Sequence, residues 1–315
     1  MNGSSSPTNH QALVKELWKD QARWSKTAGQ LKKELTNWRL YATIAGITGA
    51  VIETTAGTIA AAFNPELRIL AGVIALLGAI ILATVPFILR NKASKEKISE
   101  WVRARSVSEA LKELIYKYLI KVNYSASQQD LQELIDETEA VKEKVKDLTI
   151  YCVDIPEVPA SRPLTLTVDQ YITLRVDDQI EGYYRRKGKE KAKAAKRLHT
   201  FEFILGFLAV ILGVVAGFPA FTENFSFSFL GPWVAVVTTI AGAVTAHMAA
   251  MRYDHEAIIF FSTADRLSSL KKKWLLLSGT MNTDTINKFV DDCEHAISTE
   301  NESWLAKWAE EEKKT

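Results

Sequence analysis

Four stretches with almost no charge alternate along the chain with long segments that are dense in charged residues. The apolar stretches cover residues 41–63, 69–89, 201–221 and 230–251. Each has the length of about 20 residues that an α-helix needs to cross a hydrocarbon core. Lipid offers no partner for backbone N–H and C=O groups, so these stretches are expected to be helical. The pattern predicts an all-α integral membrane protein with four transmembrane helices.

Lysine and arginine residues lie on one side of these predicted spans. They precede the first and third spans and follow the second and fourth, whereas the two links between paired spans contain Arg68 as their only cation. Positively charged flanks stay in the cytosol. The chain is therefore predicted to form two helical hairpins with both termini and the long middle segment in the cytosol, and with links 64–68 and 219–229 outside.

The two halves of the chain align with each other at an offset of about 160 residues, which indicates an internal repeat. Gly46 then falls on Gly206, and Gly57 on Gly217. Because each unit contains two spans, the two hairpins are predicted to be parallel rather than inverted. The predicted organisation is a disordered N-terminus (1–10), a first hairpin unit (11–150), a proline-rich linker (151–163) and a second hairpin unit (164–315).

Long cytosolic helical extensions are predicted after both hairpins. No proline or loop cluster follows Pro86 before about residue 122, or follows Pro232 before about residue 278, so the second and fourth spans are expected to continue as unbroken helices well beyond the membrane. Ser127 and Thr167 are predicted N-caps of two further helices. Residues 283–312 have the apolar periodicity of one or two amphipathic helices.

Composition adds few candidates for chemistry. The formal net charge is +2, and the two cysteines, Cys152 and Cys293, lie in segments predicted to be cytosolic, where thiols stay reduced. The sequence contains no zinc-ligand spacing, phosphate loop, dinucleotide fingerprint or nucleophile motif. His247 and His255 lie near acidic residues, but a polar cluster at the membrane edge explains them better than a metal site. Neither an enzyme nor a metal or cofactor is expected.

Glu53 is the residue that most strongly suggests a function, because it lies near the middle of the first predicted span. A carboxylate in lipid is costly and is expected to face protein or water. Its neighbours on the helix are small or carry hydroxyl groups: Gly46, Ala50, Thr54, Gly57 and Thr58. One interpretation is a cation pathway in which Glu53 repeats around an oligomer axis. The other is a dry packing face, with Glu53 protonated or bonded to a threonine.

Two further sets of residues have an expected role at the membrane. Glycines in the third and fourth spans are interpreted as helix-packing positions: Gly206, Gly213, Gly217 and Gly242. A basic run precedes the third span and is interpreted as a contact with anionic lipid headgroups: Arg185, Arg186, Lys187, Lys193 and Arg197. Nucleic acid is not an expected partner, because the run lacks an exposed aromatic platform.

Several sequence motifs resemble the SLATT superfamily of bacterial membrane proteins, in two tandem units. They are W-V-R-A-R-S (101–106), A-L-K-E-L-I-Y-K-Y (110–118), H-M-A-A-M-R-Y (247–253), A-D-R-L-S-S-L-K-K-K-W (264–274) and F-V-D-D-C-E-H-A-I-S-T-E-N-E-S-W (289–304). Members are predicted pore-forming effectors in bacterial conflict and antiphage systems, often beside nucleotide-sensing partners. The resemblance implies a pore of the bacterial inner membrane that a signal opens, and it transfers no catalytic residue.

The sequence therefore predicts a homo-oligomeric ion channel or pore that favours cations and is gated through its cytosolic helices by a ligand or a protein signal. The alternative is a membrane anchor or scaffold that recruits a cytosolic partner and does not conduct. A secondary transporter is less favoured, because such proteins usually have broken helices at the midplane, for which only Pro86 and the proline-flanked outer link give a hint.

Overall fold

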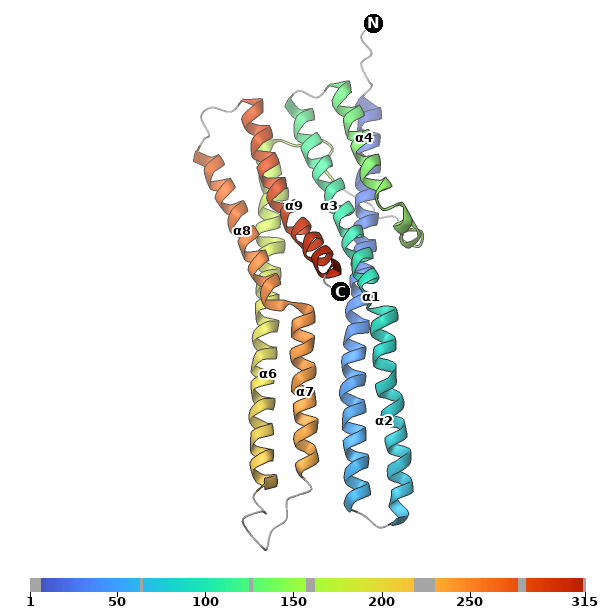
Figure 1. Ribbon diagram of the computed structural model, residues 1–315. Coiled ribbons are helices and arrows are strands. Elements are labelled where there is room, and N and C mark those ends of the chain that lie inside the picture. The colour runs from blue at the N-terminus through green and yellow to red at the C-terminus, as the bar shows by residue number, and fades with distance from the viewer. Residues whose placement is uncertain are drawn as a thin grey trace. The chain divides into compact units, whose positions relative to one another are not determined.

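The computed structural model describes residues 7–62, 65–124, 127–156, 162–217, 230–276 and 282–313, and every regular element in these ranges is helical (Figure 1). This confirms the predicted all-α class. The elements are α1 (Pro7–Ala62), α2 (Pro65–Lys92), α3 (Lys95–Tyr124), α4 (Gln128–Glu143), η1 (Lys146–Cys152), α5 (Val168–Tyr171), the π-helix η2 (Ile172–Arg185), α6 (Arg186–Gly217), α7 (Gly231–Met251), α8 (Tyr253–Leu276) and α9 (Thr283–Lys313).

Both predicted N-caps are present. The Ser127 hydroxyl accepts a hydrogen bond from the Asp130 backbone N–H at 3.3 Å, and the Thr167 hydroxyl accepts one from the Gln170 N–H at 3.3 Å. In each case the side chain three residues later returns a bond to the cap backbone, which forms a capping box. The N-terminal prediction needs correction, because α1 begins at Pro7 and residues 7–10 of the predicted disordered segment are helical.

The chain folds into two compact units that do not follow its two halves. Unit 1 contains residues 1–34, 95–188 and 258–315, and unit 2 contains residues 35–94 and 189–257. Unit 1 therefore combines the charged helices of both halves, and unit 2 contains the apolar helical stretches.

Within the described ranges, three helices are long and apolar enough to cross a membrane, through their apolar stretches in α2, α6 and α7. In the apolar windows of α2 and α6 only 6% of the residues are buried, which fits surfaces that face lipid. The predicted count of four such spans is wrong by this measure, because the stretch 41–62 of α1 is not among them. Its threonines, its glycines and Glu53 make it less apolar than the other three. Phe63 and residues 218–221, the ends of two predicted spans, lie outside the described residues.

The extensions beyond the apolar stretches are broken helices, not the continuous helices that the sequence predicted. After α2 the helix is interrupted at Ala93 and Ser94. After α7, Arg252 adopts the left-handed conformation (φ 48°), which ends one helix before α8 begins. No proline or glycine marks either break, which explains why the sequence pattern did not predict them. In both halves the interruption separates an apolar helix from a charged one.

Each hairpin is a pair of antiparallel helices that lie side by side (Figure 1). In the first, α1 and α2 approach closely at glycines: a Cβ atom added to Gly49 would lie 2.6 Å from Leu82 Cγ, and one added to Gly78 would lie 3.2 Å from the Glu53 backbone nitrogen. In the second, α6 and α7 meet through Leu205, Val237 and Val244. Glycine thus sets the spacing of the first hairpin, and branched aliphatic side chains set that of the second.

Unit 1 has one hydrophobic core to which both halves of the sequence contribute. Trp18 of α1 packs edge-on against Tyr116 of α3, with ring centroids 5.4 Å apart, and Tyr116 in turn packs against Tyr171 at 5.9 Å. From the other side, α9 adds Phe289, whose ring is 6.3 Å from that of Tyr171. The helices before and after both hairpins are therefore held together in one folded body.

Candidate functional site

Glu53 lies between the two helices of the first hairpin. Its side chain is half-buried, and its Cγ atom would lie 3.0 Å from a Cβ atom added to Gly78 of α2. Gly46, from the same predicted face, approaches Val85 of α2, whereas Gly57 has open space around its Cα. The predicted small-residue face is therefore split, with Glu53 at the α1–α2 contact and Gly57 exposed.

The threonine hydroxyls near Glu53 bond to their own helix. Thr55 Oγ1 donates to the Val51 carbonyl at 2.8 Å, and Thr58 Oγ1 donates to the Thr54 carbonyl at 2.5 Å. A hydroxyl that donates to the preceding turn still has lone pairs with which it can accept a hydrogen bond or contact a cation. Thr54, Thr58 and Ala50 are each partly exposed in the single chain.

The glycines predicted as packing positions in the second hairpin do not make the α6–α7 contact. A Cβ atom added to Gly206, Gly213, Gly217 or Gly242 would meet no atom within 4 Å. Their role in helix packing stays a prediction. Where α7 meets α8, His247 Nε2 lies 3.4 Å from the Tyr253 hydroxyl, which fits the predicted polar cluster.

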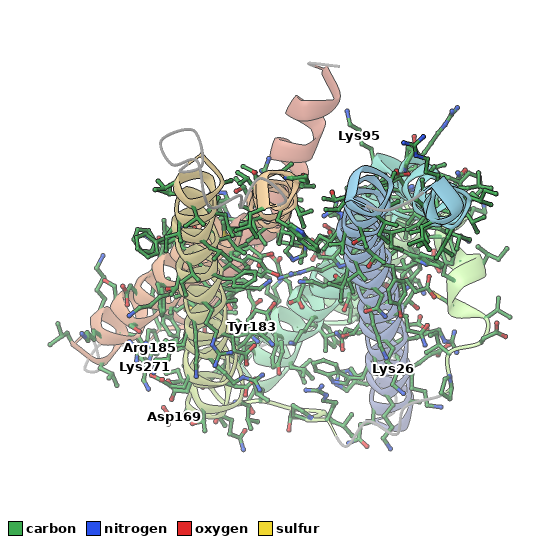
Figure 2. The ribbon with its side chains drawn as sticks, turned by 90° about the horizontal axis from the view of Figure 1, so that it is seen from below. Lys26, Lys95, Asp169, Tyr183, Arg185 and Lys271 are labelled. Atoms are coloured by element: carbon green, nitrogen blue, oxygen red, sulfur yellow. The ribbon has the colours of Figure 1, made fainter. Side chains whose placement is uncertain are left out.

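The basic run before the third span divides between three environments. Arg185 pairs with Glu181 on its own helix and lies 4.0 Å from Asp265 of α8, on the side of η2 where Lys271 binds Asp177 at 2.6 Å (Figure 2). Lys193 and Arg197 are exposed on α6. Arg186 and Lys187 line a cavity in unit 1. The prediction of one continuous lipid-contacting run is not tested by this arrangement.

A charged pair is completely buried in the core of unit 1. Arg175 of η2 donates to both carboxylate oxygens of Glu294 on α9, at 2.9 and 2.7 Å, and both side chains are at most 1% exposed. Tyr171 donates to the same carboxylate at 3.0 Å, and the guanidinium lies 5.1 Å from the centre of the Tyr116 ring. A two-bond contact of this kind fixes distance and orientation together. It joins η2 to α9 at the centre of the unit.

The cavity in unit 1 has a volume of about 590 Å³ and is lined by three helical segments. The α1 segment contributes residues at steps of three and four: Ser25, Ala28, Gly29 and Lys32. The α3 segment contributes Trp101, Arg105, Ser108, Glu109 and Lys112. The third segment, which runs from η2 into α6, contributes Asp178, Gln179, Gly182, Tyr183, Tyr184, Arg186 and Lys187. Each set is one face of a helix, so the cavity follows directly from helical periodicity.

Two contacts hold cationic side chains at the wall of this cavity. Lys32 Nζ lies 4.9 Å from the centre of the Trp101 ring, and Arg105 Nη2 donates to the Tyr183 hydroxyl at 3.2 Å. Figure 2 shows Tyr183 on η2. Glu109 Oε2 lies 3.8 Å from Arg175 Nη2, which connects the wall of the cavity to the buried pair.

The two cysteines are free thiols, and both are buried. Burial is the main cause that raises the pKa of the Cys293 thiol, and the neighbouring Glu294 carboxylate adds to it. Burial likewise raises the pKa of Cys152, although a contact with the Thr27 hydroxyl at 3.3 Å opposes the shift. Neutral buried thiols are inert. Among the described residues no group of three or more His, Cys, Asp and Glu side chains is placed to hold a metal ion.

Sequence reasoning missed both the buried pair and the cavity. Arg175 lies between Ile172, Val176 and Gln179 on the buried face of η2, and a charge inside an apolar stripe was the available signal. Glu294 lies beside Cys293 on the buried face of α9 that had been predicted. The cavity had no signal in one segment alone, because its residues come from three segments that are far apart in the chain.

Comparison with known families gives two matches, one in each half. Residues 171–304 match the family described as SMODS and SLOG-associating 2TM effector domain 1, and residues 20–130 match a family of proteins of unknown function, DUF4231. No curated protein and no solved structure matches the chain.

The first match places a SLATT-type domain at residues 171–304, and together with the apolar helices it indicates a membrane protein. The resemblance predicted from the sequence motifs is thereby confirmed, and the two matches together are consistent with a tandem SLATT-like architecture. The family description names two transmembrane segments, and the 171–304 match contains the apolar helices α6 and α7.

Proposed function

We propose that the protein is a bacterial membrane effector that forms a homo-oligomeric, cation-permeable channel, gated through unit 1. The family description supports the term effector. The inner membrane, a role in antiphage defence and the absence of catalysis are parts of this proposal. The observation that carries the channel is Glu53, a half-buried carboxylate in the apolar part of a helical hairpin.

We further propose that α1 is a fourth span, despite its lower hydropathy. Residues before and after each hairpin belong to the core of unit 1. For the first hairpin, Trp18 before α2 contacts Tyr116 after it. For the second, Tyr171 before α6 contacts Phe289 after α8. If α2 crosses the membrane once, the chain between residues 34 and 65 must also cross for the core to form on one side. An even number of crossings follows, with both termini on the same side, and the positively charged flanks of the spans assign that side to the cytosol.

The number of crossings can be tested with epitope tags at the two ends of the full chain. We expect neither tag to be cleaved by protease in spheroplasts, and both to be cleaved in inside-out vesicles. A tag placed in the 219–229 link should show the opposite pattern and serves as the control. An N-terminal tag accessible from outside, combined with a protected C-terminal tag, would mean three crossings and would contradict the proposal.

Several copies of the chain are needed to place carboxylates around a pore. The second hairpin has Gly213 at the repeat position that matches Glu53, so one chain supplies one carboxylate at this level of its spans. The exposed glycines of α6 and α7 offer surfaces on which helices of other chains can approach closely. A ring of acidic side chains is a usual basis for cation preference.

Conductance in planar bilayers tests the channel. Under a KCl gradient, the protein is expected to give a reversal potential on the cation-selective side, and Glu53→Gln should move it toward zero, because the fixed negative charge is lost. Glu143→Gln, which changes an exposed carboxylate on α4, is the matched control. No conductance in any condition, or a reversal potential that is the same in Glu53→Gln and Glu143→Gln, would count against a cation pathway.

The anchor or scaffold alternative has one favourable observation. Ile150 and Val153 beside η1 in unit 1 are 72% and 75% exposed, and exposed apolar side chains of this size suit a protein partner. Under this alternative Glu53 is a packing residue at the α1–α2 contact. The conductance measurement separates the two functions, since a scaffold conducts in neither variant.

A further inference from the structure

The cavity in unit 1 has an excess of positive charge. Five cationic side chains line it against two carboxylates; the cations are Lys32, Arg105, Lys112, Arg186 and Lys187. One of the two carboxylates, Glu109, is directed to buried Arg175 at 3.8 Å. A concave surface lined by one sign of charge concentrates ligands of the opposite sign. The cavity therefore favours an anion.

Small residues on α1 make the space for this ligand. Ser25, Ala28 and Gly29 face the cavity, and a Cβ atom added to Gly29 would have no atom within 4 Å. The resulting volume of about 590 Å³ lies within the usual range of small-molecule sites. It is larger than a single inorganic anion requires, so the anionic group belongs to an organic molecule or to a chain of linked anions.

The donor chemistry selects among anions. Two guanidinium groups (Arg105, Arg186) supply planar pairs of N–H donors, and three ammonium groups supply compact charges. This combination matches the several acceptor oxygens and the double charge of a phosphate better than it matches a single carboxylate. Tyr183 and Trp101 keep Arg105 and Lys32 at the wall, so part of the site is already organised in the absence of ligand.

We propose that this cavity binds the phosphate group of a small organic phosphate. The ligand is either a soluble cytosolic phosphate or a phospholipid headgroup, because α1 and α6 continue directly from Lys32 and Lys187 into the unit that holds the apolar helices. Binding does not depend on whether the protein conducts. Only the further step, in which a bound phosphate acts as the signal that opens the pore, rests on the proposed function.

The binding test uses the full chain in phosphatidylcholine nanodiscs. Isothermal titration calorimetry with inorganic pyrophosphate and with adenosine 5′-diphosphate measures the soluble source. Native mass spectrometry after incubation with dioctanoyl phosphatidic acid measures the lipid source. The variants are Arg105→Gln and Lys112→Gln, which remove charge, and Gly29→Leu, which fills the cavity and leaves every charge in place. Lys26→Gln, an exposed lysine on α1 outside the cavity, is the matched control (Figure 2).

Saturable binding of one probe class identifies the source. We expect at least a tenfold weaker Kd, or an equivalent loss of bound lipid, in all three cavity variants, and unchanged binding in Lys26→Gln. Gly29→Leu separates a defined site from general charge attraction, because its net charge is that of the wild type. The inference is overturned if neither probe class binds saturably, or if Arg105→Gln and Gly29→Leu bind as tightly as Lys26→Gln does.

Discussion

At the scale of single residues, the main feature is that charges occur where burial makes them costly. Arg175 and Glu294 are both buried in unit 1, and the desolvation of each ion is offset by the two direct hydrogen bonds and by the contact with Tyr171. Such a pair adds little net stability compared with apolar residues of similar size, but removal of one partner leaves an isolated buried charge. The pair therefore makes the packing of η2 against α9 specific.

This asymmetry gives a prediction for the buried pair. Arg175→Met should destabilise unit 1 by about 3–5 kcal/mol, because Glu294 is then buried without a counter-ion. The double variant Arg175→Met/Glu294→Leu should recover most of that loss. Urea unfolding followed by tryptophan fluorescence measures both, with Trp18 in the core as one reporter. Equal losses in the single and double variants would show that packing, rather than the unpaired charge, determines the effect.

At the scale of elements, local signals in the sequence predicted the helix starts well and the helix breaks poorly. Ser127 and Thr167 were predictable caps, because a hydroxyl before a periodic apolar run has one main role. A helix tolerates the residues found at the two interruptions, which are Ala93, Ser94 and Arg252. Their identity therefore gives no signal of a break. Each interruption lies where an apolar helix meets a charged one. The cavity could not be predicted from the sequence either, because each of the three helical segments that line it has the pattern of an ordinary amphipathic helix.

The capping box of α4 gives a prediction about pH. Bonds from the Ser127 backbone N–H and hydroxyl hold the pKa of Asp130 below its usual value of 3.8. A lowered folded-state pKa stabilises the fold above the unfolded value, and this contribution is lost as the pH falls through the folded value. The stability difference between wild type and Asp130→Ala should therefore be about 1 kcal/mol near neutral pH and decrease below 3.8. Urea unfolding at several pH values measures this difference, and Glu139→Ala is the control. A stability difference between wild type and Asp130→Ala that does not change with pH would refute the role of the carboxylate.

At the scale of the whole molecule, unit 1 is the feature that the sequence could not reveal. Hydropathy and charge identified the apolar stretches, and sequence motifs identified the tandem resemblance, but both suggested two units in series. The structure instead assembles one core from residues before, between and after the hairpins. Contacts such as those of Trp18 with Tyr116 and of Tyr171 with Phe289 join segments that only tertiary packing brings together.

A truncation tests how far unit 1 depends on α9. A chain that ends after Met281 lacks Phe289, Val290, Cys293 and Ile297 of the core and leaves Arg175 without Glu294. We expect unit 1 of this chain to lose cooperative unfolding and to be cleaved rapidly in limited proteolysis. A chain that ends after Glu300 retains every described core residue and should behave like the full protein. Equal protease resistance in the two truncated chains would show that α9 is not part of the core.

The discontinuous make-up of unit 1 also sets an order of events during synthesis. The core needs segments from before the first hairpin and from beyond residue 258, so both hairpins must have been synthesised before the core of unit 1 can close. Contacts this distant along the chain form late and slowly. A nascent or prematurely terminated chain can therefore insert helices while it has neither the buried pair nor a closed core. The completed unit 1 thus exists only after the last core helix has left the ribosome.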